Sequence, residues 1–343
     1  MGGSLVIQTS FLGDVILTTP LIAELAQRGP VDVIVTPVGA AALENNPDIR
    51  TIIRYDKRGT YGSALSTWQT IQEIRGRRPY QAAYLAQGSF RSGLLAMMTG
   101  AKERIGFASS TGRILYTTQL PYAPERHHAE RLWSLAMAPC ADPPTRDQIR
   151  PRVYPSDEDR QKVDGLLRRS GSHGDPFVAL APGSAWGTKR WPYYVELAKR
   201  LVAEDLRIAV IGSKPDTAIA AEIIESLPQG SVINGVDYLP LLASAELIGR
   251  AQAIVTNDSA PQHLASAMGT PTLTIFGPTV PEFGFGPLAE RNVVAGHEGL
   301  NCRPCHRHGP KRCPLGHWRC MRELSPEHIS TLLMEVLNPP VPV

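Results

Sequence analysis

Residues 254–278 constrain the fold of this chain more than any other part of the sequence. An apolar run ends in a polar turn, a stretch with helical spacing follows, and a second apolar run closes on Gly-Pro. The helical stretch has apolar residues at Leu264 and Met268, and Gly269 stops it. This strand–loop–helix–strand order predicts a parallel sheet, in which the loop that opens a helix attracts anionic ligands. An ordinary βαβ turn has the same order, so this segment alone does not decide between them.

Two further segments have the same order. Near the N-terminus, an apolar run at 5–8 leads into the loop 9–14 and then into a stretch with helical spacing. In the middle of the chain, an apolar run at 178–180 leads through a Gly-rich loop into Lys189-Arg190-Trp191-Pro192 and an amphipathic helix. Because the first turn of a helix leaves its N–H groups unused, we expect Pro192 in that turn. Three strand-to-helix loops therefore mark candidate ligand sites.

The motifs FLGD…TTP, PGS…TKRWP, TNDS…H and FGPT occur in this order along the chain. The order resembles glycosyltransferase family 9, the bacterial ADP-heptose:lipopolysaccharide heptosyltransferases, among which the enzymes that add the second heptose are the nearest match. The resemblance covers nearly the whole chain, and four ordered motifs are more specific than any one of them. It implies an α/β fold of GT-B type, with two Rossmann-like parallel-sheet domains facing across a cleft.

The 343 residues suffice for two domains, each with its own core. The segment 141–159 is rich in Pro and charge, and we expect the chain to cross between domains there. We therefore expect an acceptor-binding domain at 1–155, a nucleotide-sugar-binding domain at 156–324 and a C-terminal helix at 325–343. Ser325-Pro326 should begin that helix, which in GT-B enzymes often packs back on the first domain. The expected strands lie at 4–9, 31–35, 51–54, 80–86, 104–107, 177–181, 207–212, 231–233, 253–256, 271–276 and 292–295.

The sequence has no apolar run of membrane-spanning length, and its N-terminus lacks the basic and long apolar regions of a signal peptide. We expect a cytoplasmic enzyme at the periphery of the inner membrane. Between Arg50 and Arg131 thirteen lysine or arginine residues face five acids, although the whole chain carries only +3. Half of this excess would be ordinary solvated surface, but the rest favours an anionic partner. A Kdo-lipid A type acceptor fits that field, and without zinc-finger or RNA-binding signatures we expect no nucleic acid.

Asp14 is the only carboxylate in the first loop, and an inverting sugar transfer needs a base for the acceptor hydroxyl. Alone, it would be interpreted as a helix cap. The resemblance implies instead that Asp14, beside Gly13, is the general base. A helix N-terminus favours the ionised form, so we expect a weak base that acts partly by orienting the hydroxyl. We expect Gly13 and Arg58 to contact the acceptor.

Lys189 follows a strand and a Gly-rich loop, and the resemblance implies that it neutralises the leaving diphosphate. The helix that opens at residues 258–260 should receive the same group. Ala260 stands where family members often carry Gly, and it is small enough to keep the backbone close to phosphate. A helical histidine is more often packed than catalytic, so His263 is the weakest of these assignments. The expected donor-binding residues are Ser184, Thr188, Lys189, Asp258, Ser259, Ala260 and His263.

The transfer should require no cofactor or metal ion. A metal-binding Asp pair should follow a strand. The acidic stretch 157–159 instead begins a helix in the crossover between the domains. Four cysteines have the spacing C-x2-C-x7-C-x6-C, which differs from that of zinc ribbons. For these residues we favour reduced thiols or a local disulfide over a structural metal. They are Cys302, Cys305, Cys313 and Cys320.

The expected reaction is transfer of L-glycero-D-manno-heptose from ADP-heptose to the Kdo/heptose inner core, with inversion. One alternative is a family-9 enzyme that uses another nucleotide sugar or acceptor. A second is a non-catalytic nucleotide- or sugar-binding protein. Such a protein would need no base, so the presence of Asp14 in its motif disfavours this alternative. A third is a nucleotide-sugar epimerase on the same fold, which product analysis without acceptor would reveal.

Overall fold

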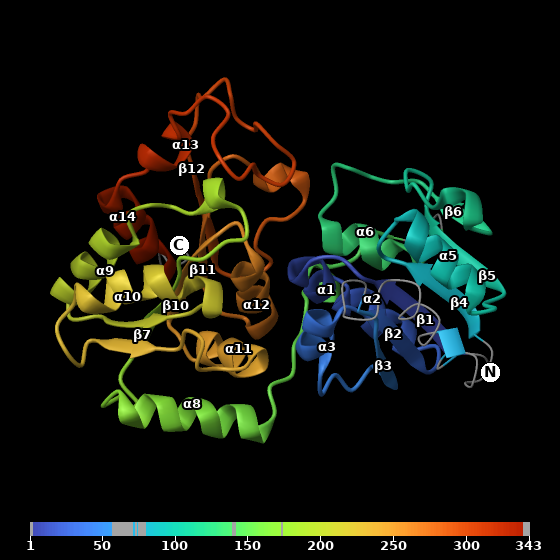
Figure 1. Cartoon of the computed structure of the whole chain (residues 1–343), viewed down its shortest axis with the longest axis horizontal. Helices are drawn as coiled ribbons and strands as arrows, with labels where there is room; N and C mark the ends of the chain where they lie inside the picture. The colour runs from blue at the N-terminus through green and yellow to red at the C-terminus, as the bar shows by residue number, and fades with distance from the viewer. Residues whose placement is uncertain are drawn as a thin grey trace. The chain divides into compact units, whose positions relative to one another are not determined.

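The computed structural model describes residues 3–56, 71–72, 74, 80–138, 142–172 and 174–338. The chain divides into two compact units, Met1–Tyr154 and Pro155–Val343. Each unit contains one six-stranded parallel sheet with helices packed beside it (Figure 1). The structure therefore has the α/β class and the parallel sheets that the alternating apolar and helical segments predict.

The first unit has the strand order β3-β2-β1-β4-β5-β6. Its strands are β1 (Gly3–Gln8), β2 (Val31–Val35), β3 (Thr51–Arg54), β4 (Tyr80–Leu85), β5 (Glu103–Phe107) and β6 (Thr118–Leu120). Its helices are α1 (Leu12–Leu17), α2 (Thr19–Ala26), α3 (Pro37–Leu43), α5 (Phe90–Met98), α6 (His128–Ser134) and α7 (Arg146–Ile149), with a 3₁₀ turn η1 (Arg113–Leu115). The short edge strand β6 was not expected, because its three half-buried or exposed residues carry no apolar run.

The second unit has the strand order β12-β11-β10-β7-β8-β9. Its strands are β7 (Phe177–Ala181), β8 (Arg207–Val210), β9 (Val232–Asn234), β10 (Ala253–Asn257), β11 (Thr272–Phe276) and β12 (Asn292–Gly296). Its helices are α8 (Asp157–Arg169), α9 (Tyr194–Ala203), α10 (Thr217–Glu225), α11 (Leu241–Gly249), α12 (Ala260–Met268), α13 (Arg319–Arg322) and α14 (Pro326–Leu337). Short 3₁₀ turns are η2 (Gly187–Lys189), η3 (Lys214–Asp216) and η4 (Pro281–Phe283).

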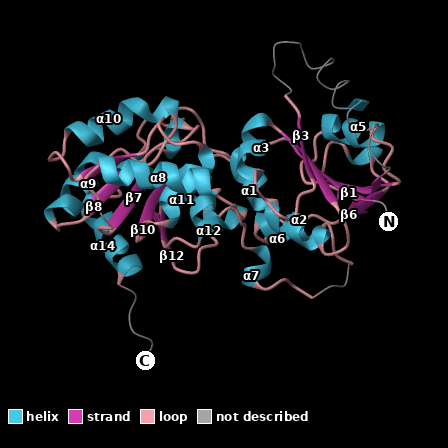
Figure 2. Ribbon diagram, turned by 90° about the horizontal axis from the view of Figure 1, so that it is seen from below, coloured by secondary structure: helices cyan, strands magenta, loops and turns pink. Residues whose placement is uncertain are grey.

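Both faces of the first sheet are buried, because alternate residues of its central strands enter different cores. In β1, Val6 packs with Val33 of β2, whereas Leu5 and Ile7 pack with Ile34 on the other face. Successive side chains of a strand point to opposite faces, so a strand covered on both sides must be apolar throughout. Helices lie beside the strands in the view from below (Figure 2). This explains why the strands appear in the sequence as continuous apolar runs.

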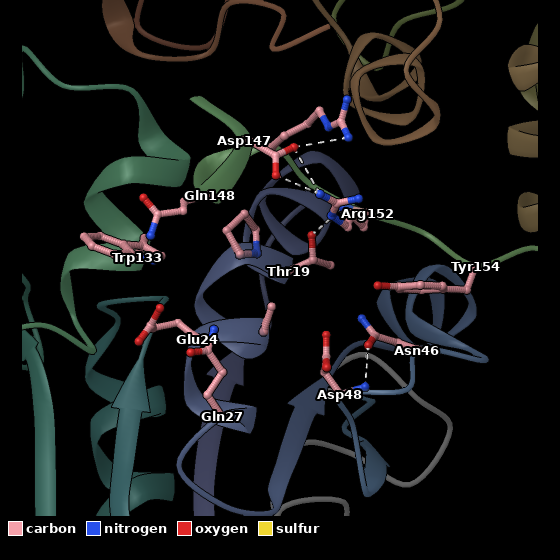
Figure 3. Close-up of a pocket in the computed structure, with 13 residues that line it drawn as sticks. Thr19, Glu24, Gln27, Asn46, Asp48, Trp133, Asp147, Gln148, Arg152 and Tyr154 are labelled. Atoms are coloured by element: carbon pink, nitrogen blue, oxygen red, sulfur yellow. Dashed lines mark hydrogen bonds and ion pairs between the residues drawn. The ribbon is translucent and has the colours of Figure 1, made fainter. Parts of the chain in front are cut away.

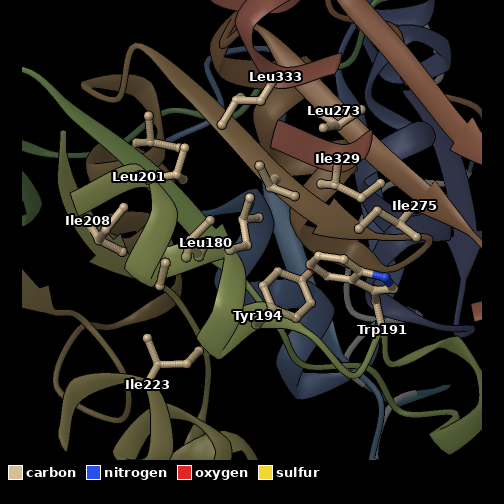
Figure 4. Packing of buried hydrophobic residues seen from close by; sticks show 14 of the residues in the cluster. Leu180, Trp191, Tyr194, Leu201, Ile208, Ile223, Leu273, Ile275, Ile329 and Leu333 are labelled. Carbon is tan, nitrogen blue, oxygen red and sulfur yellow. The ribbon is translucent and has the colours of Figure 1, made fainter. Parts of the chain in front are cut away.

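The core of the second unit includes Trp191, which lies beside Tyr194 (Figure 4). Its side chain is fully buried, and its indole N–H donates a 2.8 Å hydrogen bond to the carbonyl of Leu324. Tyr193 and Tyr194 approach its ring edge-on, at centroid distances of 5.7 and 5.3 Å. Removing a buried tryptophan of this kind typically costs about 3–5 kcal/mol. Trp191 therefore fixes the chain immediately after Lys189.

The start of α14 agrees with the prediction from the sequence, but the position of Pro192 relative to α9 does not. The side chain of Ser325 caps α14 by accepting a 3.2 Å bond from the N–H of His328, as expected for Ser-Pro. The first-turn position expected for Pro192 is wrong, because α9 begins at Tyr194. The backbone N–H of Trp191 donates a hydrogen bond to the side chain of Asn257, at the end of β10. This bond ties the residue before Pro192 to the sheet, ahead of the first turn of α9.

Helix α14 packs against α9 and against β10, β11 and β12. Its buried residues Ile329, Leu333 and Val336 belong to the core of the second unit. The apolar face of α14 is thus used inside the second unit, and the expectation that this helix packs back on the first domain stays a prediction.

Candidate active site

Lys189 ends the turn η2, in the loop between β7 and α9, and forms a buried ion pair with Asp258 after β10. The Nζ of Lys189 lies 2.5 Å from Oδ2 of Asp258, and both residues are 8% exposed. The strands β7 and β10 are neighbours in register, with Ala181 opposite Thr256, so their carboxyl ends and following loops meet. The sheet thus brings together two donor-binding residues that the sequence predicts.

The Asp258 carboxylate has two further hydrogen-bond partners besides Lys189. Oδ2 also accepts a 2.6 Å bond from the hydroxyl of Thr279, and Oδ1 accepts a 3.1 Å bond from the amide of Gln262. A carboxylate would repel a diphosphate, so these bonds favour a role in holding Lys189 over direct donor contact. Thr279 and Gln262 were missed in the sequence, although Thr279 is the last residue of the FGPT motif.

The fully buried side chain of Asn257 joins the loop after β10 to the loop that carries Lys189. Its Oδ1 accepts a 3.0 Å bond from the N–H of Trp191, and its Nδ2 donates a 2.8 Å bond to the carbonyl of Pro182. The sequence indicated only loop and cap chemistry for this asparagine. Its amide instead pairs backbone groups on both sides of the Lys189 loop, which fixes that loop over the end of the sheet.

The helix α12 begins at Ala260, directly after this loop. Ser259 is its N-cap residue, but no described side chain caps the helix; the serine hydroxyl lies 3.4 Å from the carbonyls of Gly183 and Asn257. The first turn contains Pro261, which has no N–H, and the N–H of Gln262 donates a 3.2 Å bond to the carbonyl of Ser259, so the positive end of the helix dipole is the main attraction for an anionic ligand here. His263 lies one turn further and is 4% exposed, so protein encloses most of its side chain.

Two other predicted donor-binding residues lie in the same loop and are buried, with Ser184 8% and Thr188 4% exposed. The Ser184 hydroxyl accepts a 3.3 Å bond from the N–H of Trp186. The Thr188 hydroxyl donates to the carbonyl of Pro310, from the Cys-rich part of the chain. Thr188 therefore contacts another protein segment, which the sequence did not indicate.

Asp14 lies in the first turn of α1, and its side chain is 17% exposed. The hydroxyl of Ser10 donates a 2.8 Å bond to its Oδ2, and Nε2 of His128 lies 3.5 Å from its Oδ1. Burial raises the pKa of Asp14, and the bonds from Ser10 and from the Phe11 backbone counteract it only in part. This direction is opposite to the one expected from the helix N-terminus, because desolvation of the carboxyl outweighs the effect of the short helix.

His128 is the residue of this group that sequence reasoning missed. It begins α6, far along the chain from Asp14, and its side chain is 13% exposed. Nothing in the sequence distinguishes it from the other eight histidines. Gly13 is half-buried next to Asp14 in α1. Arg58, the other expected acceptor contact, lies outside the described residues.

Several residues of the basic excess have structural partners. Arg50 forms two bonds to buried Asp32, of 2.9 and 2.7 Å. Arg54 pairs with Glu44, and Arg131 is buried against the ring of Tyr122. The positive field expected from the sequence is therefore reduced among the described residues, although exposed cations such as Arg91 and Arg113 remain.

The first unit also contains a cavity of about 180 Å³ beside α2 (Figure 3). Its lining is mixed: Asp147 bonds to Arg152, and the aromatic side chains of Trp133 and Tyr154 also contribute. Asn46 and Asp48 line it from the loop that leads to the amino end of β3. Asp14 follows the carboxyl end of β1 and is not among the lining residues, so this cavity is separate from the predicted base.

The four cysteines of the C-terminal part are free thiols, which excludes a disulfide among them in this structure. Sγ of Cys302 lies 3.9 Å from Nε2 of His317. Burial, followed by the charges of the other three cysteines, raises the pKa of Cys320 to about 11. No group of described residues has the arrangement of a metal site. Over the same residues, no helix combines the length and apolar character that a bilayer crossing requires.

Comparison with known proteins agrees with this geometry. The model of glycosyltransferase family 9 (heptosyltransferase) matches residues 67–318. Lipopolysaccharide heptosyltransferase 2 of Escherichia coli (strain K12) is 27% identical over 295 residues, which cover 81% of this chain and 84% of that relative.

Two solved structures are similar over nearly the whole chain. The glycosyl transferase family 9 protein from Veillonella parvula DSM 2008 has a TM-score of 0.84 at 20% identity, covering 98% of this chain and 97% of its own. The E. coli ADP-heptose lps heptosyltransferase II has a TM-score of 0.78 at 24% identity, covering 98% of each chain.

The two parallel-sheet domains have the GT-B type of fold that these solved structures share. The family match spans well over half of the chain, and the chain belongs to glycosyltransferase family 9. The fold class, the family and the glycosyltransferase activity expected from the motifs are thereby confirmed.

Proposed function

We propose that this enzyme transfers L-glycero-D-manno-heptose from ADP-heptose to the Kdo/heptose inner core of lipopolysaccharide, with inversion at the anomeric carbon. The names of the relatives support the sugar and the acceptor class. The single observation that supports the mechanism is the Asp14 carboxylate, which is buried, bonded to Ser10 and close to His128. Its raised pKa makes it a stronger base than a solvated aspartate.

In this proposal, the second unit binds the donor. Lys189 neutralises charge on the diphosphate as the bond to the sugar breaks, and the N–H groups at the start of α12 stabilise the same group. Asp258, Thr279 and Asn257 keep Lys189 and its loop in place. Lys189 and helix N–H groups offer the diphosphate a charge partner without a metal ion, and we therefore expect chelators to leave the transfer rate unchanged.

The first unit binds the acceptor in this proposal. Asp14 removes the proton of the acceptor hydroxyl as that oxygen attacks the anomeric carbon, and ADP leaves from the opposite face. Gly13 and the exposed cations of this unit contact the anionic acceptor, a Kdo-lipid A type molecule. Such an acceptor would hold the enzyme at the cytoplasmic face of the inner membrane, as a peripheral protein.

The test is incubation of the enzyme with a panel of nucleotide sugars and with Kdo-lipid A fragments that carry no heptose or one heptose. We expect transfer only from ADP-heptose, best to the fragment with one heptose, and an α-linked product if the donor is β-linked. Efficient transfer from a uridine- or guanosine-linked sugar would reject the donor. Conversion of the nucleotide sugar without any acceptor would indicate an epimerase instead.

A further inference from the structure

The Cys-rich segment, which we define as residues 302–318, has no role in the reaction proposed above. It carries four lysine or arginine residues and three histidines, and it contains no aspartate or glutamate. A run of one charge is ordinarily a solvated surface. Most residues of this segment are indeed exposed, but several of its contacts are with the predicted donor site.

One end of the segment is fastened to the loop after β11. The guanidinium of Arg303 donates a 2.8 Å bond to the carbonyl of Gly277 and a 3.3 Å bond to that of Thr279. The N–H of Cys305 donates a 3.1 Å bond to the carbonyl of Pro278. These carbonyls belong to the FGPT motif, whose threonine also bonds to Asp258.

The middle and the C-terminal end of the segment contact η2. The hydroxyl of Thr188 donates to the carbonyl of Pro310, and the indole of Trp318 donates a 2.9 Å bond to the carbonyl of Thr188. A Cβ on Gly187 would lie 2.8 Å from the carbonyl oxygen of Lys311, too close for any other residue. The two stretches of backbone therefore touch.

Gly309 brings the segment against Lys189 itself. Its φ of +82° is a left-handed conformation that glycine adopts readily. A Cβ at this position would lie 3.1 Å from Cε of Lys189, so a larger residue would press on the lysine side chain. The segment consequently forms one wall of the Lys189 site.

His308, the residue before Gly309, is exposed at this wall. Its ring stacks on that of Trp186, with centroids 6.5 Å apart and planes 16° from parallel. Burial first, and then the charges of Arg307, Lys189 and His306, lower the pKa of His308, while Asp258 opposes them. The histidine therefore lies within the electrostatic field of the Lys189–Asp258 pair.

A diphosphate needs more positive charge than that pair offers. Lys189 and Asp258 neutralise each other at 2.5 Å, so the pair carries no net charge toward an incoming anion. The N-terminus of α12 supplies partial charge only. A hydrogen-bond donor at the wall, able to take up a proton when an anion arrives, would supply the remainder.

We propose that the Cys-rich segment is part of the donor site and that His308 binds the diphosphate of the donor through its imidazole N–H. This inference rests on the proposed donor role of Lys189. Stacking on Trp186 fixes the ring plane, and Gly309 allows the close approach to Lys189.

Two substitutions separate this role from packing. His308→Phe keeps an aromatic ring on Trp186 but has no N–H donor, whereas His308→Gln keeps an N–H donor and loses the ring. The exposed His328→Ala on α14 is the matched control. Dissociation constants for ADP and for adenosine would be measured by calorimetry, together with KM for the nucleotide sugar and kcat.

We expect His308→Phe to weaken ADP binding about tenfold, the usual size of a lost bond to a charged group. His308→Gln should weaken it less than about threefold, and His328→Ala should have no effect. Adenosine, which has no diphosphate, should bind all variants equally. ADP affinity that is normal in His308→Phe but reduced in His308→Gln would show that the ring only packs, which overturns the proposal.

Measuring Lys189→Ala in the same experiment separates the role of His308 from the location of the donor site. If Lys189→Ala weakens ADP binding and the His308 variants do not, the inference on His308 is wrong and the donor site stands. If Lys189→Ala also leaves ADP binding unchanged, the donor site itself is misplaced.

Discussion

The ammonium of Lys189 lies 2.5 Å from the Asp258 carboxylate, inside a unit where both side chains are almost fully buried. The pair joins two loops that are 69 residues apart in the chain. In a nucleotide-sugar site, this arrangement holds the lysine in place before the donor arrives, so that little side-chain entropy is lost on binding. Asp258 thus positions the lysine that we propose to neutralise charge on the diphosphate.

Lys189→Ala should weaken ADP binding by about 10- to 100-fold and slow transfer, because the lysine serves the bound diphosphate and the leaving group. It should also destabilise the second unit by about 3–5 kcal/mol, since Asp258 is left as an unpaired buried charge. Adding Asp258→Asn should recover most of that stability but not ADP affinity. Thermal unfolding and calorimetry measure the two effects, and joint recovery would contradict the assignment of Lys189 to the diphosphate.

Asp14→Asn should reduce kcat by about 10²- to 10⁴-fold, the usual effect of removing a general base. Its affinity for ADP should stay within a few-fold of the parent, because the proposed donor-binding residues lie in the second unit. Initial rates with ADP-heptose and titration with ADP would measure both quantities. Near-normal turnover in this variant would sink the assignment of Asp14 as the base.

The same substitution should change the pH dependence of stability. Burial raises the pKa of Asp14 in the folded protein above the ordinary 3.8, so the folded state holds the proton more tightly than the unfolded chain. The stability that this group contributes is present below the unfolded pKa and is lost as the pH rises through the folded pKa. Asp14→Asn should therefore raise the Tm at pH 7, and the gain should shrink toward pH 4.

Unfolding curves at several pH values test this, with Asp157→Asn as control because Asp157 is a highly exposed aspartate of α8. A gain in Tm that does not vary with pH would show that Asp14 is not desolvated as described. His128, close to Asp14, will reduce the effect when it is protonated, so the series is best repeated in a His128→Gln background.

His128→Ala should lower kcat about tenfold and leave the KM for donor and acceptor nearly unchanged. The reason is that His128 lies against Asp14 and would act by keeping its carboxylate oriented beside Ser10. His128→Gln, which retains an N–H donor, should recover part of the rate. In the Asp14→Asn background neither substitution should slow the reaction further, and additive losses would show that His128 acts independently of Asp14.

Arg58→Glu should raise the acceptor KM and leave donor affinity unchanged, if the basic stretch of the first unit attracts the acceptor. Added salt should raise the same KM by screening. Arg160→Glu, a charge reversal on the exposed side of α8, is the control. Arg50, Arg54 and Arg131 already have partners within the protein, which reduces the expected field. If neither Arg58→Glu nor salt changes the acceptor KM, the basic stretch does not take part in acceptor binding.

The sequence by itself determined the class of fold and many of its element boundaries. Parallel strands buried on both faces must be apolar throughout, and such runs are visible without a structure, as at Phe177–Ala181 and Ala253–Asn257. Local hydrogen bonds fix helix ends in the same way, as Ser325 does for α14. The four ordered motifs also pointed to the correct family and to the loops that carry Lys189 and Asp14.

Only the tertiary structure decided how those residues are paired. The contacts of Lys189 with Asp258 and of Asp14 with His128 join loops and helices far apart in the chain, and they depend on strand order and register. Desolvation of Asp14 likewise depends on what covers it, so the sequence suggested the opposite shift in its pKa. Strand β6 and the position of the Cys-rich segment were not predictable for the same reason: periodicity reports which residues are buried, but not which residues they are buried against.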